Sequence, residues 1–308
     1  MTKIIYEKDL PLSEDVVCTI GNFDGFHKGH KEILHILKEE AKKSHKKSVV
    51  ITFYPHPKKV LKKDSSHCNI TNIETRNFLL TKEGIDYLLV IKFDENFYKK
   101  SPEEFLKYLT EKVKCRKLVV GHDWKFGYKK EGDINFAKSF AEKHNLKIVV
   151  IPPIKKSGKR ISSTIIRQFL KEGNVEKASK YLGRQFFIYG KVVEGDKRGR
   201  KIGFPTINIE PPEDFCLKKG VYAGYVIIKN KKFPAVINYG NRPTVDGEKT
   251  FIEAHLLEPV EEKIEDDYLQ VIFLKFLREE KKFPDVEMLK KQIKKDINIA
   301  KEVLEIAK

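Results

Sequence analysis

The sequence predicts an α/β domain with a doubly wound parallel sheet, followed by a small antiparallel β-barrel domain with a C-terminal helix. In the first 183 residues, short β-branched runs alternate with amphipathic helical segments, which is typical of a parallel sheet covered by helices. After Gly183, strand-like runs follow one another across turn-rich loops. A chain of 308 residues is long enough for two domains, which we expect at 1–183 and 184–308.

The first domain is expected to alternate strands and helices. Its strands are predicted at 16–20, 48–53, 87–91, 117–120 and 147–151. A glycine-rich turn after the first strand opens a helix over 29–44. Ser101 and Glu104 predict another helix start, because they form a capping box around Pro102 at the first helical position. Asp133 can cap a further helix.

The second domain is expected to consist mostly of strands. They are predicted at 186–194, 221–228, 233–239, 251–257 and 269–276. Only the segment 285–307 has a helical period, so we expect its apolar residues to share one face. These residues are Met288, Ile293, Ile297, Ala300 and Leu304.

Composition narrows the classes of function. No run approaches the roughly 18 apolar residues of a membrane span, so no membrane partner is expected. The net charge of +17 comes mostly from lysines interleaved with glutamates. The simpler interpretation of this charge is a solvated surface, and the more specific one is attraction for nucleic acid or nucleotide phosphates. No RRM, KH or zinc-finger pattern supports nucleic acid.

The cysteines predict a reducing, cytoplasmic environment. The chain has four of them, and they form no CxxC pair: Cys18, Cys68, Cys115 and Cys216. This scatter argues against a zinc site and against a disulfide framework.

A twelve-residue turn, TIGNFDGFHKGH at 19–30, is the first candidate site. Gly21 and Gly25 allow a sharp turn and a close approach of the backbone to a ligand. The following helix start offers free N–H groups to phosphate, and His27 and His30 lie on one helical face. Neither the dinucleotide fingerprint nor the P-loop is present. Solvated histidines on a surface turn, or a metal pair without a third ligand, are the alternatives.

The whole turn resembles the long form of the HxGH signature of nucleotidylyltransferases, as found in the FMN adenylyltransferase module of prokaryotic FAD synthetases. Three further segments follow in the family's order. FYPHP at 53–57 is similar to FxPHP, and VGHDWKFG at 120–127 is similar to VGxDFxFG, with Trp124 in place of phenylalanine. ISSTIIR at 161–167 is similar to ISSTxIR, with Ile165 where arginine is common.

The resemblance implies that an FMN phosphate oxygen attacks the α-phosphate of ATP and that pyrophosphate leaves. It implies three catalytic residues, His27, His30 and Arg167. The implied nucleotide-binding residues are Gly21, Asn22, Phe23, Asp24, Gly25, Ser162, Ser163 and Thr164. The implied flavin-binding residues are Phe53, Pro55, His56, Pro57, Asp123 and Phe126. A plain N-capped helix would explain the hydroxyls at 162–164 equally well.

A basic glycine loop, GDKRGRKIGFPTIN at 195–208, is the second candidate site. Its glycines and cations suit a polyphosphate, although a basic hairpin is the simpler interpretation. Thr206 and Asn208 are two apart on an extended segment, so their side chains share a face. Both offer oxygen ligands that suit Mg²⁺. The residues expected to bind nucleotide here are Gly195, Lys197, Gly199, Lys201 and Gly203.

This loop resembles the PTAN motif of riboflavin kinases, with Ile207 in place of alanine. GVYA at 220–223, NRPT at 241–244 and FLR at 276–278 are similar to further family segments, which implies flavin binding by Arg278. Glu253 lies on the polar face of its strand, as a solvent-facing residue also would. The family's ExHLL segment implies that Glu253 takes the proton of the ribityl 5′-hydroxyl of riboflavin as that oxygen attacks the γ-phosphate of ATP.

Together the resemblances cover nearly the whole chain and imply a bifunctional transferase. It would make FMN and then FAD from riboflavin and ATP with Mg²⁺, in the cytoplasm and without a nucleic-acid partner. A single-activity descendant, a non-catalytic flavin- or nucleotide-binding regulator, and another nucleotidylyltransferase fused to an unrelated barrel are the alternatives.

Overall fold

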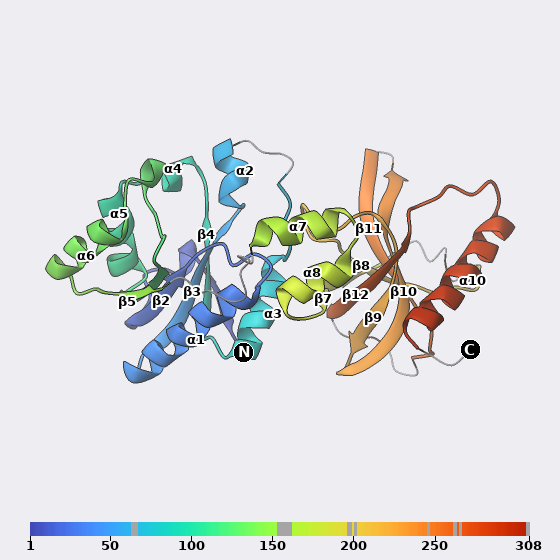
Figure 1. Ribbon diagram of the computed structural model, residues 1–308, viewed down its shortest axis with the longest axis horizontal. Coiled ribbons are helices and arrows are strands. Elements are labelled where there is room, and N and C mark those ends of the chain that lie inside the picture. The colour runs from blue at the N-terminus through green and yellow to red at the C-terminus, as the bar shows by residue number, and fades with distance from the viewer. Residues whose placement is uncertain are drawn as a thin grey trace. The chain divides into compact units, whose positions relative to one another are not determined.

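The computed structural model describes residues 1–62, 67–152, 162–195, 199, 202–244, 247–260, 264 and 267–305. The chain forms two compact units. Unit 1 comprises Met1–His67 and Arg76–Ile161, and unit 2 comprises Cys68–Thr75 and Ser162–Lys308. Figure 1 shows the parallel sheet of the first unit and the barrel of the second.

Unit 1 is built on a six-stranded parallel sheet in the order β1-β4-β3-β2-β5-β6. The strands are β1 (Lys3–Tyr6), β2 (Val16–Ile20), β3 (Lys47–Tyr54), β4 (Tyr87–Lys92), β5 (Cys115–Gly121) and β6 (Lys147–Ile151). The five predicted strands are confirmed, whereas the short edge strand β1 was not predicted. Every residue of β2 is buried, as expected for a central strand with both faces covered.

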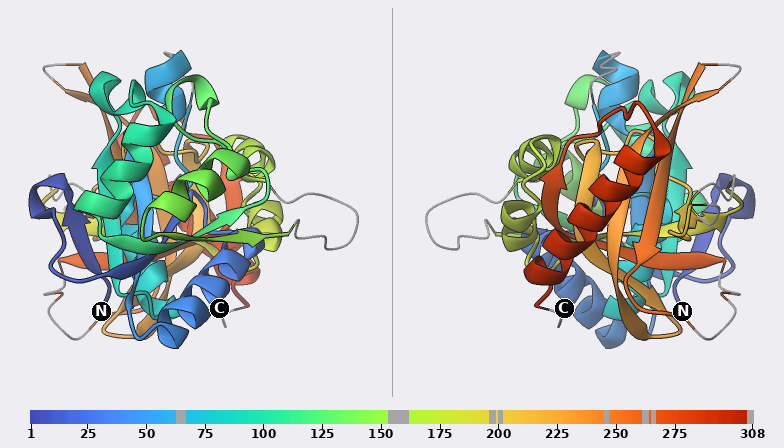
Figure 2. Two further views of the ribbon diagram at one scale, coloured as in Figure 1. Left: turned by 90° about the vertical axis from the view of Figure 1, so that its left-hand side faces the viewer. Right: turned by 90° about the vertical axis from the view of Figure 1, so that its right-hand side faces the viewer.

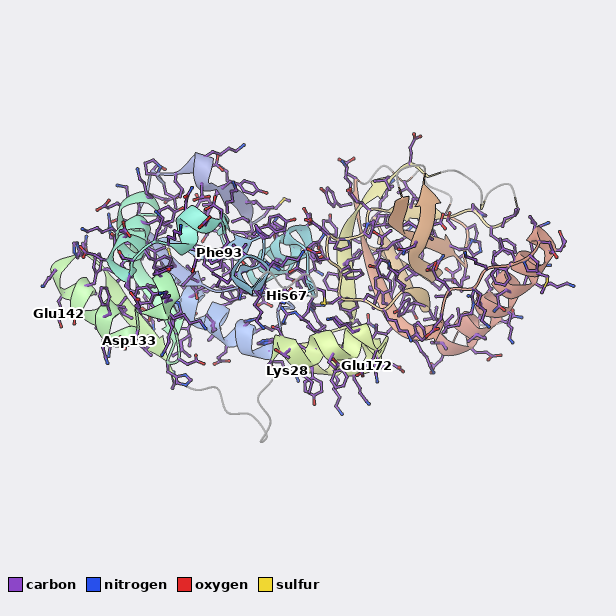
Figure 3. All side chains as sticks on the ribbon, turned by 90° about the horizontal axis from the view of Figure 1, so that it is seen from above. Lys28, His67, Phe93, Asp133, Glu142 and Glu172 are labelled. Atoms are coloured by element: carbon purple, nitrogen blue, oxygen red, sulfur yellow. A yellow bond between two sulfur atoms is a disulfide. The ribbon has the colours of Figure 1, made fainter. Side chains whose placement is uncertain are left out.

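Helices connect and cover these strands (Figure 1). They are α1 (Lys28–Lys43), α2 (Pro57–Lys62), α3 (Ile73–Glu83), α4 (Glu95–Tyr98), α5 (Pro102–Lys107) and α6 (Ile134–Lys143). The predicted capping box of α5 is confirmed, because the Ser101 N–H donates to Glu104 Oε2 (2.7 Å) and the Glu104 N–H donates to Ser101 Oγ (3.2 Å). Asp133, labelled in Figure 3, accepts a hydrogen bond from the Phe136 N–H and caps α6.

Unit 2 contains a closed antiparallel barrel in the order β10-β11-β8-β7-β12-β9. Its strands are β7 (Phe186–Val193), β8 (Ile207–Ile209), β9 (Gly220–Ile228), β10 (Lys231–Thr244), β11 (Gly247–Leu256) and β12 (Tyr268–Arg278). All five predicted strands are confirmed. The short strand β8 lies within the predicted extended segment of the basic loop.

Among the residues that the structure describes, the helices α7 (Ser163–Lys171), α8 (Val175–Leu182) and α10 (Val286–Val303) accompany the barrel. Ala300 on α10 packs in an apolar cluster with Val221 and Val236 of the barrel, and Figure 2 shows this helix lying along the strands. Met288 was predicted on the apolar face, but this is wrong, because its side chain is 49% exposed. Its neighbour Leu289, about 100° further round the helix, faces the barrel instead.

The predicted domain boundary at 183/184 differs from the division into compact units. Unit 2 includes α7, α8 and residues 68–75, which the sequence-based division places in the first domain. The boundary at 183/184 therefore stays a prediction, and the compact units provide a second division to test against it.

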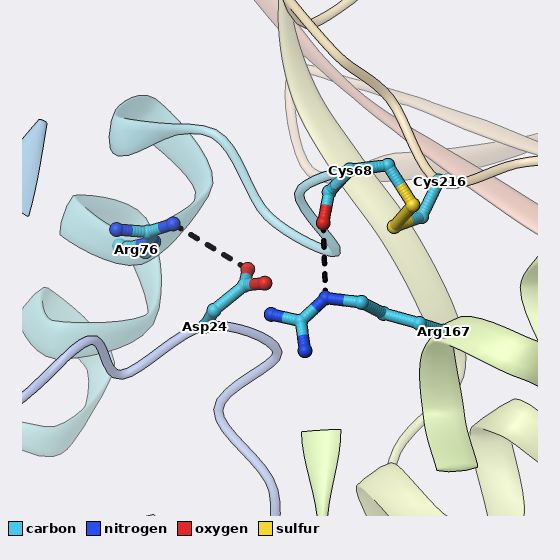
Figure 4. Close-up of a disulfide and its surroundings, with 5 residues drawn as sticks. All are labelled: Asp24, Cys68, Arg76, Arg167 and Cys216. Carbon is cyan, nitrogen blue, oxygen red and sulfur yellow. Dashed lines mark hydrogen bonds and ion pairs between the residues drawn. A yellow bond between two sulfur atoms is a disulfide. The ribbon is translucent and has the colours of Figure 1, made fainter. Parts of the chain in front are cut away.

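The expectation that the chain has no disulfide is wrong. Cys68 and Cys216 form one within unit 2, with their Cα atoms 4.9 Å apart (Figure 4). Backbone hydrogen bonds hold the two segments together, since the Asn69 N–H donates to Asp214 O (2.7 Å) and the Cys216 N–H donates to Asn69 O (3.0 Å). The cysteines are 148 residues apart, so sequence spacing could not indicate their pairing.

Candidate active sites

The turn after β2 is a compact, unusual backbone structure in unit 1. Phe23, Gly25 and Phe26 all have positive φ angles of 44°, 87° and 54°, which only glycine adopts readily. The neighbouring strand holds this turn, because Gly21 N–H donates to the Ile51 carbonyl (3.0 Å) and Thr52 Oγ1 donates to the Asn22 carbonyl (3.0 Å). Nonglycine residues persist in such a conformation when their surroundings fix it, and they cluster at functional sites.

The two predicted catalytic histidines lie together at the start of α1. His27 is the residue before the first helical position, and the rings of His27 and His30 stack with centroids 3.8 Å apart. Their Nδ1 atoms are buried and have no hydrogen-bond partner among the described residues. The pair lies at the N-terminal end of a helix, where phosphate binds well.

Burial makes both histidines weak bases. It lowers the pKa of His27 to about 4. The Asp24 carboxylate has the opposite, smaller effect of raising this pKa. Burial also lowers the pKa of His30 well below its usual range, and the nearby His27 lowers it further. Both rings are therefore neutral at pH 7, and each has one donor and one acceptor nitrogen. A phosphate nearby would favour the protonated forms.

Arg76 is a residue of this region that sequence reasoning missed. It comes from α3, and its Nη2 lies 3.4 Å from Asp24 Oδ1, with the two side chains only 5% and 1% exposed (Figure 4). Its Nη1 donates to Thr52 Oγ1 (3.3 Å), the hydroxyl that holds the Asn22 carbonyl. The sequence indicated this role only weakly. Arg76 is a single arginine shortly before an apolar run, and most such arginines reach solvent.

The predicted flavin-binding residues follow the ends of β3 and β5. Phe53, the residue before the end of β3, packs edge to face with Phe93, and His56 is buried beside His67. After β5, Trp124 stacks on Phe126 with centroids 4.2 Å apart, so the tryptophan preserves the aromatic character of the motif. Because β3, β2 and β5 are adjacent and parallel, these segments and the histidine turn share the carboxyl edge of the sheet, where ligands bind in such folds. The remaining predicted residues of this set are Pro55, Pro57 and Asp123.

The hydroxyl-rich segment after 161 belongs to unit 2. Ser162 precedes the first residue of α7, but its side chain makes no capping hydrogen bond, so the plain capping interpretation is wrong for this serine. Arg167 Nε donates to the Cys68 carbonyl (2.9 Å), beside the disulfide (Figure 4). Arg167 and Ser162–Thr164 therefore lie in a different compact unit from the histidines, and their catalytic and nucleotide-binding roles stay predictions.

Unit 2 has a cavity of 490 Å³ between the barrel strands and α10. Its polar lining includes Thr206, Glu253 and Arg278, all of which the sequence singled out. Glu253 is the direct partner of Asn208 across β11 and β8, and directly opposed strand residues project to one face. The structure therefore brings the predicted base, metal ligands and flavin-binding arginine to one region.

The basic loop is partly described. Lys197 and Lys201 lie outside the described residues, while Gly199 lines the cavity. Gly195 lies against the Asn208 amide, where a Cβ atom would come within 2.3 Å of Nδ2. This position therefore requires glycine if Asn208 is to keep its place. Gly203 has a φ of 89°, which accounts for its glycine in a turn.

Two residues of this loop have side chains that suit a divalent cation. The Thr206 hydroxyl and the Asn208 amide are oxygen donors that suit Mg²⁺, which completes its shell with water and phosphate. His255 Nδ1 lies 2.8 Å from the carbonyl oxygen of Pro205, the residue before Thr206. Among the residues that the structure describes, no group of three or more His, Cys, Asp or Glu side chains could hold a metal.

Asp296 and Asn238 are cavity residues that sequence reasoning missed. Asp296 on α10 is 2% exposed and accepts hydrogen bonds from Arg278 Nε (2.9 Å) and Nη2 (2.7 Å), and from Gln292 Nε2 (2.8 Å). Asn238 is the direct partner of Glu253 on β10. In the sequence, Asp296 stands out only as a charged residue within an amphipathic helix. Asn238 gives no indication of a role, because isolated asparagines are common in strands near loops.

The part of the chain that the structure describes contains no helix long and apolar enough to cross a membrane. The sequence model of a family described as FAD synthetase matches residues 10–165, and that of riboflavin kinase matches residues 182–304. These two matches leave residues 166–181, which include most of α7 and α8, unassigned.

Several curated proteins are similar over almost their whole length. A bifunctional riboflavin kinase/FMN adenylyltransferase from Escherichia coli K12 is 36% identical over 96% of this chain and 95% of its own. Its counterpart from Buchnera aphidicola of Schizaphis graminum is 38% identical over 94% of both chains. A solved Streptococcus pneumoniae structure, titled a macrolide-efflux protein, has a TM-score of 0.76 and 31% identity over 97% of this chain and 98% of its own. This chain belongs to the family of bifunctional riboflavin kinase/FMN adenylyltransferases.

Proposed function

We propose that this protein phosphorylates riboflavin with ATP to give FMN, and then adenylylates FMN with a second ATP to give FAD and pyrophosphate. Both family matches and the bifunctional relatives support the two reactions. The single observation that carries the kinase assignment is the placement of Glu253, which lines one cavity with Thr206 and pairs directly with Asn208.

In the kinase reaction, Glu253 acts as the general base. Its carboxylate accepts the proton of the ribityl 5′-hydroxyl as that oxygen forms a bond to the γ-phosphorus of ATP. The bond from the γ-phosphorus to the bridging oxygen breaks, and ADP leaves. Such a base typically contributes about 10²–10⁴-fold to the rate.

Thr206 and Asn208 would hold Mg²⁺ together with the phosphates of ATP. When bound, this ion neutralises negative charge on the polyphosphate. The glycines of the loop allow the backbone to approach the phosphates, and Arg278 takes part in holding the flavin.

In the adenylyl transfer, His27 and His30 contribute imidazole N–H groups to the phosphates of ATP. An FMN phosphate oxygen attacks the α-phosphorus, and pyrophosphate carries away the electron pair of the broken bond. Positioning and charge neutralisation supply most of the catalysis in such transfers. Arg167 adds a cation for the leaving pyrophosphate in this proposal.

ATP, riboflavin and FMN are the proposed small-molecule partners, and no nucleic-acid partner is proposed. A cytoplasmic location is proposed because both reactions consume ATP. The cysteines no longer support that location, since two of them form a disulfide.

The variant Glu253→Gln tests the kinase assignment. It preserves the shape of the side chain and removes its basicity, so FMN production from riboflavin should fall by about 10²–10⁴-fold. The same preparation, supplied with FMN and ATP, should make FAD at the wild-type rate, which controls for folding. Chromatography of the flavins measures both. Wild-type phosphorylation by this variant would exclude Glu253 as the base.

A further inference from the structure

The cavity of unit 2 between the barrel and α10, here called the kinase cavity, is crossed by a row of residues. Each residue of the row comes from one of five neighbouring barrel strands. Directly paired residues of antiparallel strands project to the same face of the sheet. The pairs run in the order Arg278 on β12, Val221 on β9, Asn238 on β10, Glu253 on β11 and Asn208 on β8. The first four of these residues line the cavity, so a ligand there lies along the row.

The order of the row matches the order of groups in riboflavin. Arg278, at one end, is the proposed contact of the flavin ring. Glu253 and Asn208, at the other end, serve the reacting hydroxyl and the phosphate. A ribityl chain that joins the ring to the reacting hydroxyl must pass the two residues between these ends, Val221 and Asn238. Asn238 is the polar one of the two, and it lies one strand spacing of about 4.8 Å from Glu253.

The amide oxygen of Asn238 has no hydrogen-bond donor as partner among the residues that the structure describes. This Oδ1 atom is buried. An unsatisfied buried acceptor is costly and calls for an explanation. Its two neighbours in the row cannot donate, because Val221 is apolar and an ionised Glu253 is only an acceptor. A hydroxyl of the substrate can.

We propose that Asn238 orients riboflavin in the kinase site. Its amide oxygen accepts a hydrogen bond from a hydroxyl within the ribityl chain, and this contact brings the terminal hydroxyl to Glu253. The contact also makes the site selective for a hydroxylated side chain over an alkyl one. This inference rests on the proposed roles of Glu253 and Arg278.

The variant Asn238→Leu has a similar volume and removes the acceptor. The value of kcat/KM for riboflavin should fall roughly 10- to 100-fold, the effect of leaving one polar group unpaired. The KM for ATP and the rate of FMN adenylylation should be unchanged. The melting temperature should not fall, because the substitution removes an unsatisfied buried acceptor. Asn241→Leu is the matched control, since Asn241 lies on the same strand and outside the residues that line the cavity.

A substrate comparison separates orientation from a merely structural role. The alternative substrate is a flavin whose side chain keeps only the terminal hydroxyl. Wild-type protein should prefer riboflavin by kcat/KM, and Asn238→Leu should lose most of this preference, because the two changes remove the same hydrogen bond. An unchanged preference would overturn the inference, whatever the melting temperature.

The variant Glu253→Gln, measured beside it, identifies which idea fails. If Glu253→Gln still phosphorylates riboflavin, the proposed site is wrong and the inference falls with it. If Glu253→Gln is inactive but the preference of Asn238→Leu matches that of the wild type, only the role of Asn238 is refuted.

Discussion

The disulfide between Cys68 and Cys216 should stabilise unit 2 strongly. It ties the segment 68–75 to the barrel and closes a loop across 148 residues. In the chain-entropy estimate, a loop of this length corresponds to about 5 kcal/mol at 25 °C. Residues 76–161 lie inside the loop and belong to unit 1, so their own folding shortens its flexible part. We therefore expect about 3–5 kcal/mol.

The measurement is thermal unfolding with and without a thiol reductant, followed by a probe of the barrel. Reduction should lower the unfolding temperature of unit 2 by about 10 °C, given the size of this unit. Cys216→Ser should melt at the lower temperature in both conditions, which controls for other effects of the reductant. Equal melting of oxidised wild type and Cys216→Ser would refute the reasoning.

Three further predictions concern unit 1 and the boundary between the units. His30→Ala should lower kcat for FMN adenylylation by about 10²–10³-fold with riboflavin phosphorylation unchanged; normal turnover with a lower melting temperature would contradict a catalytic role. Arg76→Met should destabilise unit 1 by about 3–5 kcal/mol, because it removes one partner of a buried ion pair, and denaturant titration would show no such loss if that pair contributes little. A fragment of residues 162–308 should phosphorylate riboflavin and resist proteolysis better than one of 184–308, since α7 and α8 belong to unit 2; equal resistance would favour the boundary at 183/184.

Regular periodicity made most of the fold predictable. The buried strands of unit 1 are apolar runs, and in the barrel Ile252 and Ala254 alternate with Glu253 and His255. Such patterns report which face of an element is buried. The capping of α5 was predictable for a local reason, since its partners lie within four residues of one another.

Features that depend on distant segments were not predictable. The strand β8 is only three residues long and takes its hydrogen bonds from β7 and β11. Met288 and Leu289 are both apolar, and only the direction from which α10 meets the barrel decides which is buried.

The residues of the candidate sites were likewise predictable where they belong to a local sequence pattern and not where they depend on distant segments. Glu253 and the histidine pair stand in motifs whose residues are close in sequence. Arg76 and Asn238 matter through partners that the fold supplies, namely Asp24 on another loop and Glu253 on the next strand. A sequence pattern carries no information on such a pairing when each residue alone is ordinary on a surface.

The central claim is that one chain makes both FMN and FAD. The most direct test is a time course of the purified wild-type protein with riboflavin, ATP and Mg²⁺, with the flavins separated by chromatography. FMN should appear first and FAD should follow at its expense, with ADP and pyrophosphate as the other products. Accumulation of FMN without FAD, or unchanged riboflavin in a preparation that converts added FMN to FAD, would contradict a bifunctional enzyme.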